Sequence, residues 1–556
     1  MADKKQGEKM KVSNKEKRIM IIMLAITTML CLSTISLTYL NYRIYFVREA
    51  NENNNVTITS VDLTDSQKIS DFDFLCKTID ESMAFKNEYE LATGVSFDKY
   101  LEKYREKILE TETDFDFFAL IYNMISNIPS AHTNVVTSYD QLCMSNIYNT
   151  DNICGIKNIN AYIDYWQALS MENAKRLRDF EYYTFAYITS DGGKYLYNNT
   201  TGMPSRFDEN TIIEVNGINI DEYIKSDIYN PGIYFDGINQ KYYKSVLIFS
   251  NNPDHTPVDL LLQNEKGEKY NETLYADFKY FIIPSALNED FPAVESVITE
   301  DSYFFNDDKN DLTYCFIKRI DLQNKETVFH ELSKSRKNVI IDLRNNSGGN
   351  ILNLKEALAP VINESTNYEC KWYVPATKQN INAIYFCKLT DKISAFINQP
   401  YSIAMSNGRK MLLFTENMEV QSLAAQKHNV YVLIGPETCS AADRITNIFL
   451  NQPNTVVVGN NTSGEGLGGP AIMSALPQSR IVFSYYASYP DGKSTNSLSG
   501  TTPDHYIYDA DYKGYLLLRE MCKSGIDGNT YENRLKWDNV LIKTLELIKE
   551  DDNTVN

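Results

Sequence analysis

The sequence VYVLIGPETCSAADRITNIF, residues 430–449, predicts a strand, a turn and a helix in succession. Its first five residues are apolar and are followed by Gly435 and Pro436, which interrupt a strand. Apolar residues then recur at helical spacing: Ala441, Ile445, Ile448 and Phe449. A strand that leads through a short turn into a helix is typical of α/β layers with parallel strands. Ser440 lies at the start of the expected helix.

Ser440 has two interpretations. As a helix N-cap, its oxygen would accept a backbone N–H, and its removal would cost about 1 kcal/mol. As a nucleophile, it would lie beside the N–H groups and the positive dipole end of the helix, which stabilise developing negative charge. Ala441 and Ala442 leave room for a peptide carbonyl. Because caps are far commoner than nucleophiles, the second interpretation needs a partner base.

A second informative stretch is NVIIDLRNNSGGN, residues 338–350. Its apolar residues 339–341 predict a strand that is buried on both faces. Gly348 and Gly349 in the following turn can adopt backbone angles denied to other residues, so their amides can face a bound oxygen. An ordinary loop with glycine turn residues is the alternative.

A third stretch, NIPSAHTNVV at residues 127–136, supplies a candidate base. His132 is one of only five histidines in the chain. Imidazole titrates near neutral pH and is the usual base for a nucleophilic serine. A lone histidine after a helix is more often a polar loop residue, so only pairing with Ser440 would give His132 a catalytic role.

The rest of the chain changes in character along its length. Apolar residues at three-to-four spacing predict helices between residues 65 and 130. From 182 to 281, short runs rich in Tyr, Ile and Val predict strands, with a hairpin turn at Asn216-Gly217. Strands alternate with helices from 312 to 547. We therefore expect a linker and helical region at 41–181, a β-rich domain at 182–290 and an α/β core at 300–548.

The amino-terminal residues predict a membrane anchor. Residues 1–18 carry seven Lys/Arg and three acidic residues, a net charge of +4, and residues 19–40 contain no charged side chain. As a helix, this uncharged run would cross the ~30 Å hydrocarbon layer. It is longer than a signal-peptide core and lacks a small-x-small exit. We expect a cytoplasmic tail at 1–18, one transmembrane helix at 19–40, and the remainder outside the cell membrane.

Composition excludes several classes of protein. The 556 residues include 54 Lys+Arg and 73 Asp+Glu; the net charge of −19, less the +4 of the segment 1–18, leaves −23 for the remainder. This acidity argues against a nucleic-acid binder and predicts that basic or neutral substrates reach the site more readily than acidic ones. Nine cysteines without a CxxC pair predict no metal knuckle and do not reveal their pairing. His330-Glu331 begins like the zinc motif HExxH, but Lys334 replaces the second histidine, so no metal or organic cofactor is expected.

Six stretches occur in an order that resembles the tail-specific, or carboxy-terminal processing, serine peptidase family. They are SAHT at 130–133, IIEVNG at 212–217, VIIDLRNNSGG at 339–349, TCSAAD at 438–443, VVVGNNTSGEG at 456–466 and GTTPD at 500–504. The resemblance implies a ClpP/crotonase-like α/β core, a preceding helical part and a PDZ-like domain that includes residues 212–220. It implies Ser440 as nucleophile, with oxyanion donors at the amide of Ala441 and of either Gly348 or Gly349.

The stretch TSGEG departs from the lysine-using branch of that family. That branch has a general-base lysine within a T-x-G-K-G pattern, where this chain has Glu465. The chain is closer to the branch that resembles tricorn, which uses a histidine from the SAHT-like segment together with a glutamate. His132 matches that histidine, while Ser497 stands where the glutamate is expected. Glu465, Ser130 and Ser497 therefore remain candidates for the third catalytic residue.

These patterns predict a membrane-anchored serine endopeptidase that cleaves extracytoplasmic peptides or unfolded protein segments. The alternative is a catalytically inactive relative that binds peptides or other extracytoplasmic ligands, since the lysine is replaced and the expected glutamate is missing. Cys439 beside Ser440 is expected to be a buried packing residue. The oligomeric state leaves no sequence signal.

Overall fold

The computed structural model describes twenty-one segments of the chain: residues 57–84, 89–91, 96–126, 128, 130–136, 158–178, 183–189, 195–197, 210–225, 233–236, 241–249, 258–274, 301–321, 324–385, 401–404, 410–469, 471–490, 500–507, 517–518, 521 and 524–555. The expected tail at 1–18 and transmembrane helix at 19–40 lie outside these segments. Within them, no helix has the length and apolarity that crossing a membrane requires.

A six-stranded sheet forms the centre of the carboxy-terminal half. Its order is β10-β11-β12-β16-β17-β21, and all pairs are parallel except the antiparallel pair β10–β11. The strands are β10 (Ser302–Asp307), β11 (Leu312–Ile317), β12 (Asn338–Asp342), β16 (Asn429–Ile434), β17 (Thr455–Gly459) and β21 (His505–Tyr506). The mixed α/β fold predicted for this half is confirmed. All five residues of β12 are buried, as its apolar run predicts.

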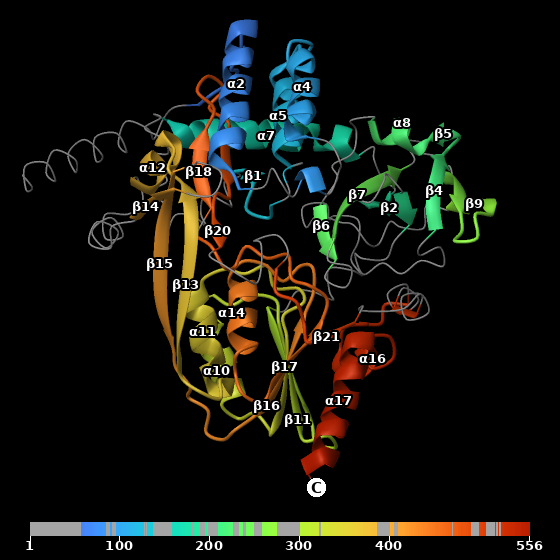
Figure 1. Cartoon of the computed structure of the whole chain (residues 1–556), viewed down its shortest axis with the longest axis vertical. Helices are drawn as coiled ribbons and strands as arrows, with labels where there is room; N and C mark the ends of the chain where they lie inside the picture. Colours follow the sequence, from blue (N-terminus) through green and yellow to red (C-terminus); the bar gives the residue numbers. More distant parts are fainter. Residues whose placement is uncertain are drawn as a thin grey trace, which may run out of the picture.

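Helices cover both faces of this sheet (Figure 1). On one face lie α10 (Lys325–Leu332), α11 (Ile351–Leu358) with the 3₁₀ turn Ala359–Val361, and α14 (Ala441–Phe449). On the other lie α16 (Tyr531–Arg534) and α17 (Asn539–Val555). Neighbouring β12 residues divide between the two cores: Ile341 packs with the first set and Ile340 with the second. Both faces of the strand therefore have apolar neighbours, which is why the run reads as continuously hydrophobic.

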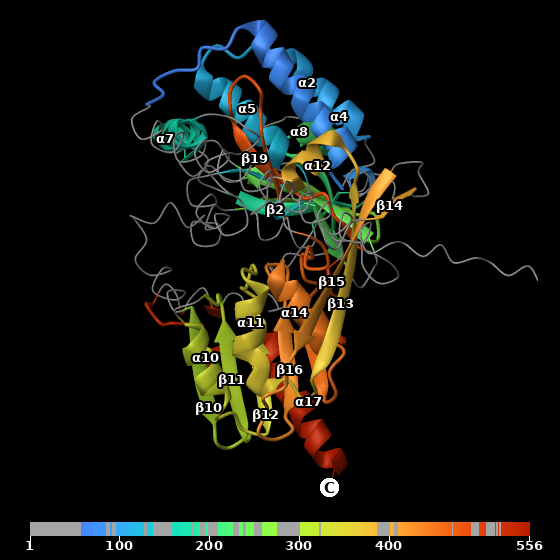
Figure 2. The same cartoon turned by 90° about the vertical axis from the view of Figure 1, so that its left-hand side faces the viewer.

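A second, antiparallel sheet lies within the region where only alternating strands and helices were expected. Its order is β14-β15-β13-β20. The strands are β14 (Tyr401–Ala404), β15 (Lys410–Val420), β13 (Thr366–Pro375) and β20 (Tyr489–Pro490). The two long strands β13 and β15 run from the α/β layers toward α12 (Lys378–Tyr385) (Figure 2). The expectation of simple alternation was wrong here because β13 mixes exposed and buried positions without a regular period.

The amino-terminal helices share a core with strands from the far end of the chain. The helices predicted between 65 and 130 are present and a further one follows: α2 (Asp65–Ser82), α4 (Phe97–Lys107), α5 (Asp114–Ser126) and α7 (Ile159–Arg178). Their apolar faces pack against residues such as Phe483 and Tyr485. Those residues belong to a three-stranded sheet made of β1 (Asn134–Val135), β19 (Val482–Tyr485) and β18 (Ile472–Ala475). This packing joins the first described helices to strands that lie between β17 and β21 in sequence.

The predicted β-rich region also forms. Its strands, with one short helix, are β2 (Tyr183–Thr189), β3 (Tyr195–Tyr197), β4 (Asn210–Val215), β5 (Ile218–Asn219), α8 (Ile220–Lys225), β6 (Ile233–Asp236), β7 (Lys241–Phe249), β8 (Val258–Gln263) and β9 (Lys269–Leu274). Asn216 and Gly217 both have positive φ, 51° and 74°, and join β4 to β5 as the sequence predicts. Its likeness to a PDZ domain stays a prediction.

Candidate active site

Ser440 lies in a strained turn between β16 and α14. Its backbone has φ 53° and ψ −120°, a rare combination for a residue with a side chain. The Ser440 amide donates to the carbonyl of Gly464 at 2.9 Å. Although Ser440 occupies the N-cap position, its hydroxyl makes no capping hydrogen bond. Instead Oγ lies 3.0 Å from Nε2 of His132, so the simple cap interpretation does not describe this serine.

His132 reaches Ser440 because the short strand β1 pairs with β19. Asn134 opposes Ser484 in that pair, and the Ser484 hydroxyl donates to the His132 carbonyl at 2.9 Å. The imidazole stacks on the ring of Tyr486, with centroids 5.6 Å apart and planes 21° from parallel. The backbone and the ring of His132 are therefore both fixed by the segment that follows β18.

Glu465 meets the other side of His132. Its Oε2 contacts Nδ1 of His132 and accepts the His132 amide at 3.0 Å, while Oε1 accepts the Ala131 amide at 3.0 Å. The Glu465 side chain is fully buried. Of the three candidates for a third residue, Glu465 is the one in contact with the imidazole. The Ser130 hydroxyl is buried without a hydrogen-bond partner among the described residues, and Ser497 lies outside them.

The pKa of His132 reflects two opposing influences. Burial lowers the pKa, but the charge and the hydrogen bond of Glu465 outweigh burial, so the pKa is raised above its ordinary value. The imidazole nevertheless keeps 26% of its side-chain surface exposed. A neutral His132 with its proton on Nδ1, facing Glu465, leaves Nε2 free to accept the Ser440 proton.

The glycines after β12 lie at unequal distances from Ser440. A Cβ on Gly348 would lie 2.8 Å from both the Cys439 carbonyl and the Ser440 Cβ, whereas a Cβ on Gly349 would meet only a carbonyl at 4.0 Å. The Gly348 amide donates to Asn346 Oδ1 at 2.9 Å. The amides of Gly349 and Ala441 donate no hydrogen bond to any described residue. Gly348 thus permits the close approach, and those two amides remain available to an oxyanion.

Cys439 is a buried thiol, as the sequence predicts. Burial, with a further contribution from the charge of Glu465, raises the pKa of the thiol well above its usual range. The thiol therefore stays protonated at neutral pH and is a poor nucleophile. Its neighbour Ser440, with an imidazole at hydrogen-bond distance, has the geometry for that role.

Asp443 holds the loops around the site together, a role that sequence reasoning missed. Its buried carboxylate accepts the hydroxyls of Thr462 at 2.5 Å and Thr501 at 2.7 Å, and the amides of Thr501 and Gly466 at 3.0 Å. Burial raises the pKa of Asp443 despite these hydrogen bonds. The sequence signal for this role was the presence of the stretches TCSAAD, TSGEG and GTTPD. Asp443 lies in the first stretch, and its carboxylate binds residues of the other two. Asp443 thereby fixes the Glu465 loop relative to Ser440.

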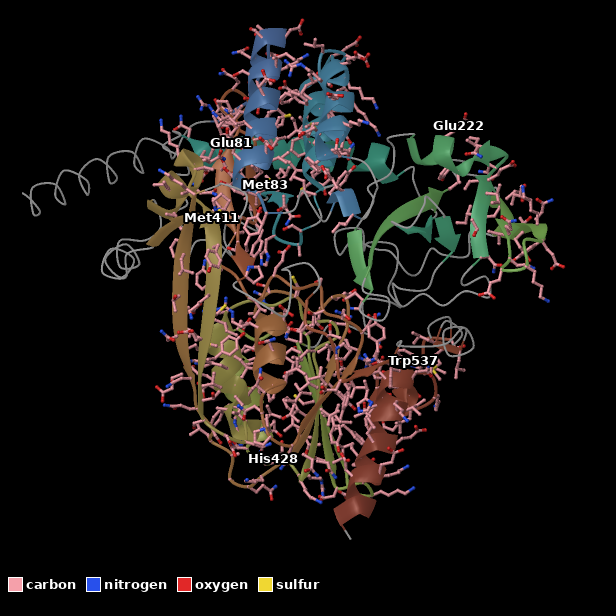
Figure 3. The ribbon with its side chains drawn as sticks, in the orientation of Figure 1. Glu81, Met83, Glu222, Met411, His428 and Trp537 are labelled. Carbon is pink, nitrogen blue, oxygen red and sulfur yellow. The ribbon has the colours of Figure 1, made fainter. Side chains whose placement is uncertain are left out.

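A buried ion cluster anchors the other end of the Gly348 loop. Arg344 binds Asp342 and Asp538, each at 2.6 Å, and Arg534 binds Asp538 at 2.9 Å. The Arg534 guanidinium also lies 5.5 Å from the ring centroid of Trp537, which Figure 3 labels beside α17. Burial alone would raise the pKa of Asp342, but Arg344 and Arg534 lower it to about 2. The loop that carries Gly348 therefore begins at a fixed, charge-compensated point.

Comparison with known proteins gives a family match for the part that carries Ser440. Residues 317–507 match the model of peptidase family S41. A search of curated proteins found no match. Similar solved structures include mature CPAF complexed with lactacystin (TM-score 0.44, 13% identity, 88% of this chain and 99% of that chain). A putative peptidase from Parabacteroides merdae has a TM-score of 0.40 at 13% identity, over 87% of this chain and 97% of that chain.

The photosystem II D1 C-terminal processing protease is also similar, with a TM-score of 0.34 and 14% identity over 85% of this chain and all of that chain. All three TM-scores are below 0.5, so the assignment depends on the family match. The matched residues include β12, the Gly348 loop, Ser440 and Glu465. Residues 317–507 are therefore similar to peptidase family S41, and the chain is a serine-type peptidase.

Proposed function

We infer that the chain is a serine endopeptidase that uses Ser440 as nucleophile, His132 as general base and Glu465 as the residue that orients His132. The observation that carries this proposal is the continuous chain of contacts from Glu465 through both imidazole nitrogens to the Ser440 hydroxyl. Three residues from separate segments of the chain meet there, an arrangement that ordinary helix capping does not require.

Catalysis begins when the neutral His132 takes the Ser440 proton at Nε2 and Oγ attacks the scissile carbonyl. The resulting oxyanion accepts hydrogen bonds from the backbone amides of Ala441 and Gly349, beside the positive end of α14. His132 then gives its proton to the leaving amine, and water releases the acyl group by the same steps. Glu465 stabilises the imidazolium that forms in each half-reaction.

Glu465 also supports membership of the histidine-using branch. In the lysine-using branch, a neutral lysine would occupy its position and take the serine proton directly. An ionised carboxylate in contact with Nδ1 performs a different task, since it orients a separate base and raises its pKa. The inactive-relative alternative depended on the absence of a suitable orienting residue, and Glu465 supplies one.

The site is proposed to lie outside the cell membrane, behind the anchor at residues 19–40. The support is the uncharged run at 19–40 with a +4 segment before it. Its substrates would be peptides or unfolded protein segments. Protease added to intact cells should digest the Ser440-containing part and leave residues 1–18 protected; protection of the whole chain would contradict this topology.

Labelling with an active-site serine reagent tests the catalytic proposal. The reagent should modify Ser440 in the full chain, and Ser440→Ala should abolish both labelling and peptide cleavage. His132→Ala should lower kcat by about 10⁴-fold or more, because the nucleophile then lacks its base. A control, His428→Ala, should retain cleavage, since His428 Nδ1 contacts only the backbone of Arg336 at the far end of the core (Figure 3). Full activity in Ser440→Ala would overturn the proposal.

A further inference from the structure

Three metal-ligating side chains converge beside the nucleophile. An imidazole nitrogen of His132, the Sγ of Cys439 and a carboxylate oxygen of Glu465 all lie within 4.8 Å of one another. A tetrahedral zinc ion, with bonds of about 2.0–2.3 Å, holds its ligands about 3.3–3.8 Å apart. To bind one ion, the wider separations must shorten by up to roughly 1 Å, whereas coordination through Nδ1 requires the direct contact between His132 and Glu465 to open. Both shifts are within the reach of side-chain rotation.

The two buried ligands are fixed by their surroundings. The Cys439 amide donates to the Asn346 carbonyl at 3.1 Å, and Cys439 forms an isolated parallel bridge with Gly464, next to Glu465. Glu465 is held by the amides of Ala131 and His132. Ligands supported by such hydrogen bonds bind metals more tightly, because little order must be gained on binding. The partly exposed imidazole of His132 leaves a path for the ion.

The chemistry of the donors selects the metal. One thiolate, one imidazole and one carboxylate suit zinc or a similar borderline ion, whereas magnesium and calcium prefer oxygen ligands alone. Two anionic ligands and one neutral ligand balance the charge of a divalent ion in a buried site. The bound ion forms three bonds to the protein, and the thiol proton passes to solvent.

We propose that His132, Cys439 and Glu465 form an inhibitory binding site for Zn²⁺ within the active site. Coordination through Nδ1 would break the contact with Glu465, and coordination through Nε2 would block the Ser440 hydroxyl. Either mode removes the base, so the metal-bound enzyme is inactive. The binding site depends only on the geometry above, whereas the inhibition rests on the proposed function of His132.

Cobalt provides a readout of binding that does not need activity. Co²⁺ added to the chelator-treated full chain should produce a thiolate-to-cobalt charge-transfer absorption, and Zn²⁺ should abolish it by displacement. The absorption should appear equally in Ser440→Ala, disappear in Cys439→Ala, and persist in the matched control Cys76→Ala, which removes a free cysteine on α2. Should Cys439→Ala fail to fold, Cys439→Ser removes the same thiolate with less change of volume.

Activity measurements then test the inhibition. Zn²⁺ should stop peptide cleavage by the wild type, a chelator should restore it, and Cys439→Ser should raise the half-inhibiting Zn²⁺ concentration by about 100-fold. Absence of the cobalt absorption, or its persistence in both Cys439 variants, would overturn the metal site even in an active peptidase. Cobalt absorption together with an uninhibited wild type would overturn the inhibitory role. An inactive chain that shows the absorption would contradict the proposed function alone.

Discussion

Two buried charged clusters flank the Gly348 loop, and they differ in what their charges can do. In the ion cluster, Asp342 and Asp538 face Arg344 and Arg534, with side chains no more than 6% exposed. Arginine does not lose its proton in proteins, so these charges are permanent. In the proposed catalytic cluster, Glu465 faces His132, whose imidazole can gain and lose a proton and whose side chain keeps 26% of its surface exposed.

The comparison distinguishes charged groups that stabilise the fold from charged groups that can exchange a proton with a nucleophile. The ion cluster joins β12 to the start of α17 and contributes a fixed structure, because each carboxylate has a guanidinium partner. The catalytic cluster has one carboxylate and one partner that can accept or release a proton toward Ser440. A buried salt bridge therefore does not by itself indicate a catalytic site; an exchangeable proton beside a nucleophile does.

The largest expected effect follows from breaking the ion cluster. Arg344→Met leaves two buried carboxylates with one guanidinium, so the free energy of unfolding should fall by about 3–5 kcal/mol. Thermal unfolding of the full chain measures this loss. The matched control is Arg105→Met, which breaks the exposed ion pair between Arg105 and Asp73 and should cost less than about 1 kcal/mol. Equal effects of the two substitutions would show that the ion cluster does not support the fold.

A somewhat smaller effect, on the catalytic rate, is expected from a substitution of Gly348 in the loop between the two clusters. In Gly348→Ala the new Cβ would lie 2.9 Å from the Ala441 amide and would push the loop away from Ser440, so kcat should fall by about 10²–10³-fold. Gly217→Ala in the turn between β4 and β5 is the control, since φ is positive at both glycines but a Cβ at Gly217 would meet no atom within 4 Å. Peptide cleavage should therefore decline much less in Gly217→Ala. Equal losses would indicate that backbone strain, rather than contact with the nucleophile, controls activity.

The smallest effect concerns substrate charge. The charges of the two carboxylates and two guanidiniums of the ion cluster cancel one another, whereas the chain outside residues 1–18 carries a net charge of −23. Matched basic peptides should therefore be cleaved with a kcat/KM a few-fold higher than acidic ones, and added salt should reduce the difference. Equal and salt-insensitive values would show that the acidic field does not reach the site.

Much of this arrangement could be predicted from sequence because local patterns specify local structure. The strand, turn and helix around Ser440 follow from apolar spacing, and the hairpin at Asn216 follows from turn chemistry. The position of Ser440 at a helix start was also predictable. In each case the deciding contacts join residues that are close neighbours along the chain.

The contacts that complete the site could not be predicted in the same way. His132 is placed by a short strand that pairs with β19, far along the chain, and a strand of two residues leaves no periodicity. The sequence made Glu465 a candidate but left Ser130 and Ser497 open beside it, because only the fold brings Glu465 to the imidazole. The support from Tyr486 and Asp443 depends equally on long-range packing.

The pH dependence of kcat/KM in Glu465→Gln tests the central claim most directly. Because Glu465 raises the pKa of His132, the wild type should lose activity on acidification at a pH above the ordinary histidine pKa of about 6.5. Glutamine keeps the size of the side chain but removes the charge, so activity should fall and its acidic limb should move to lower pH, with chelator present throughout. An acidic limb that stays in place would contradict a catalytic base held by Glu465.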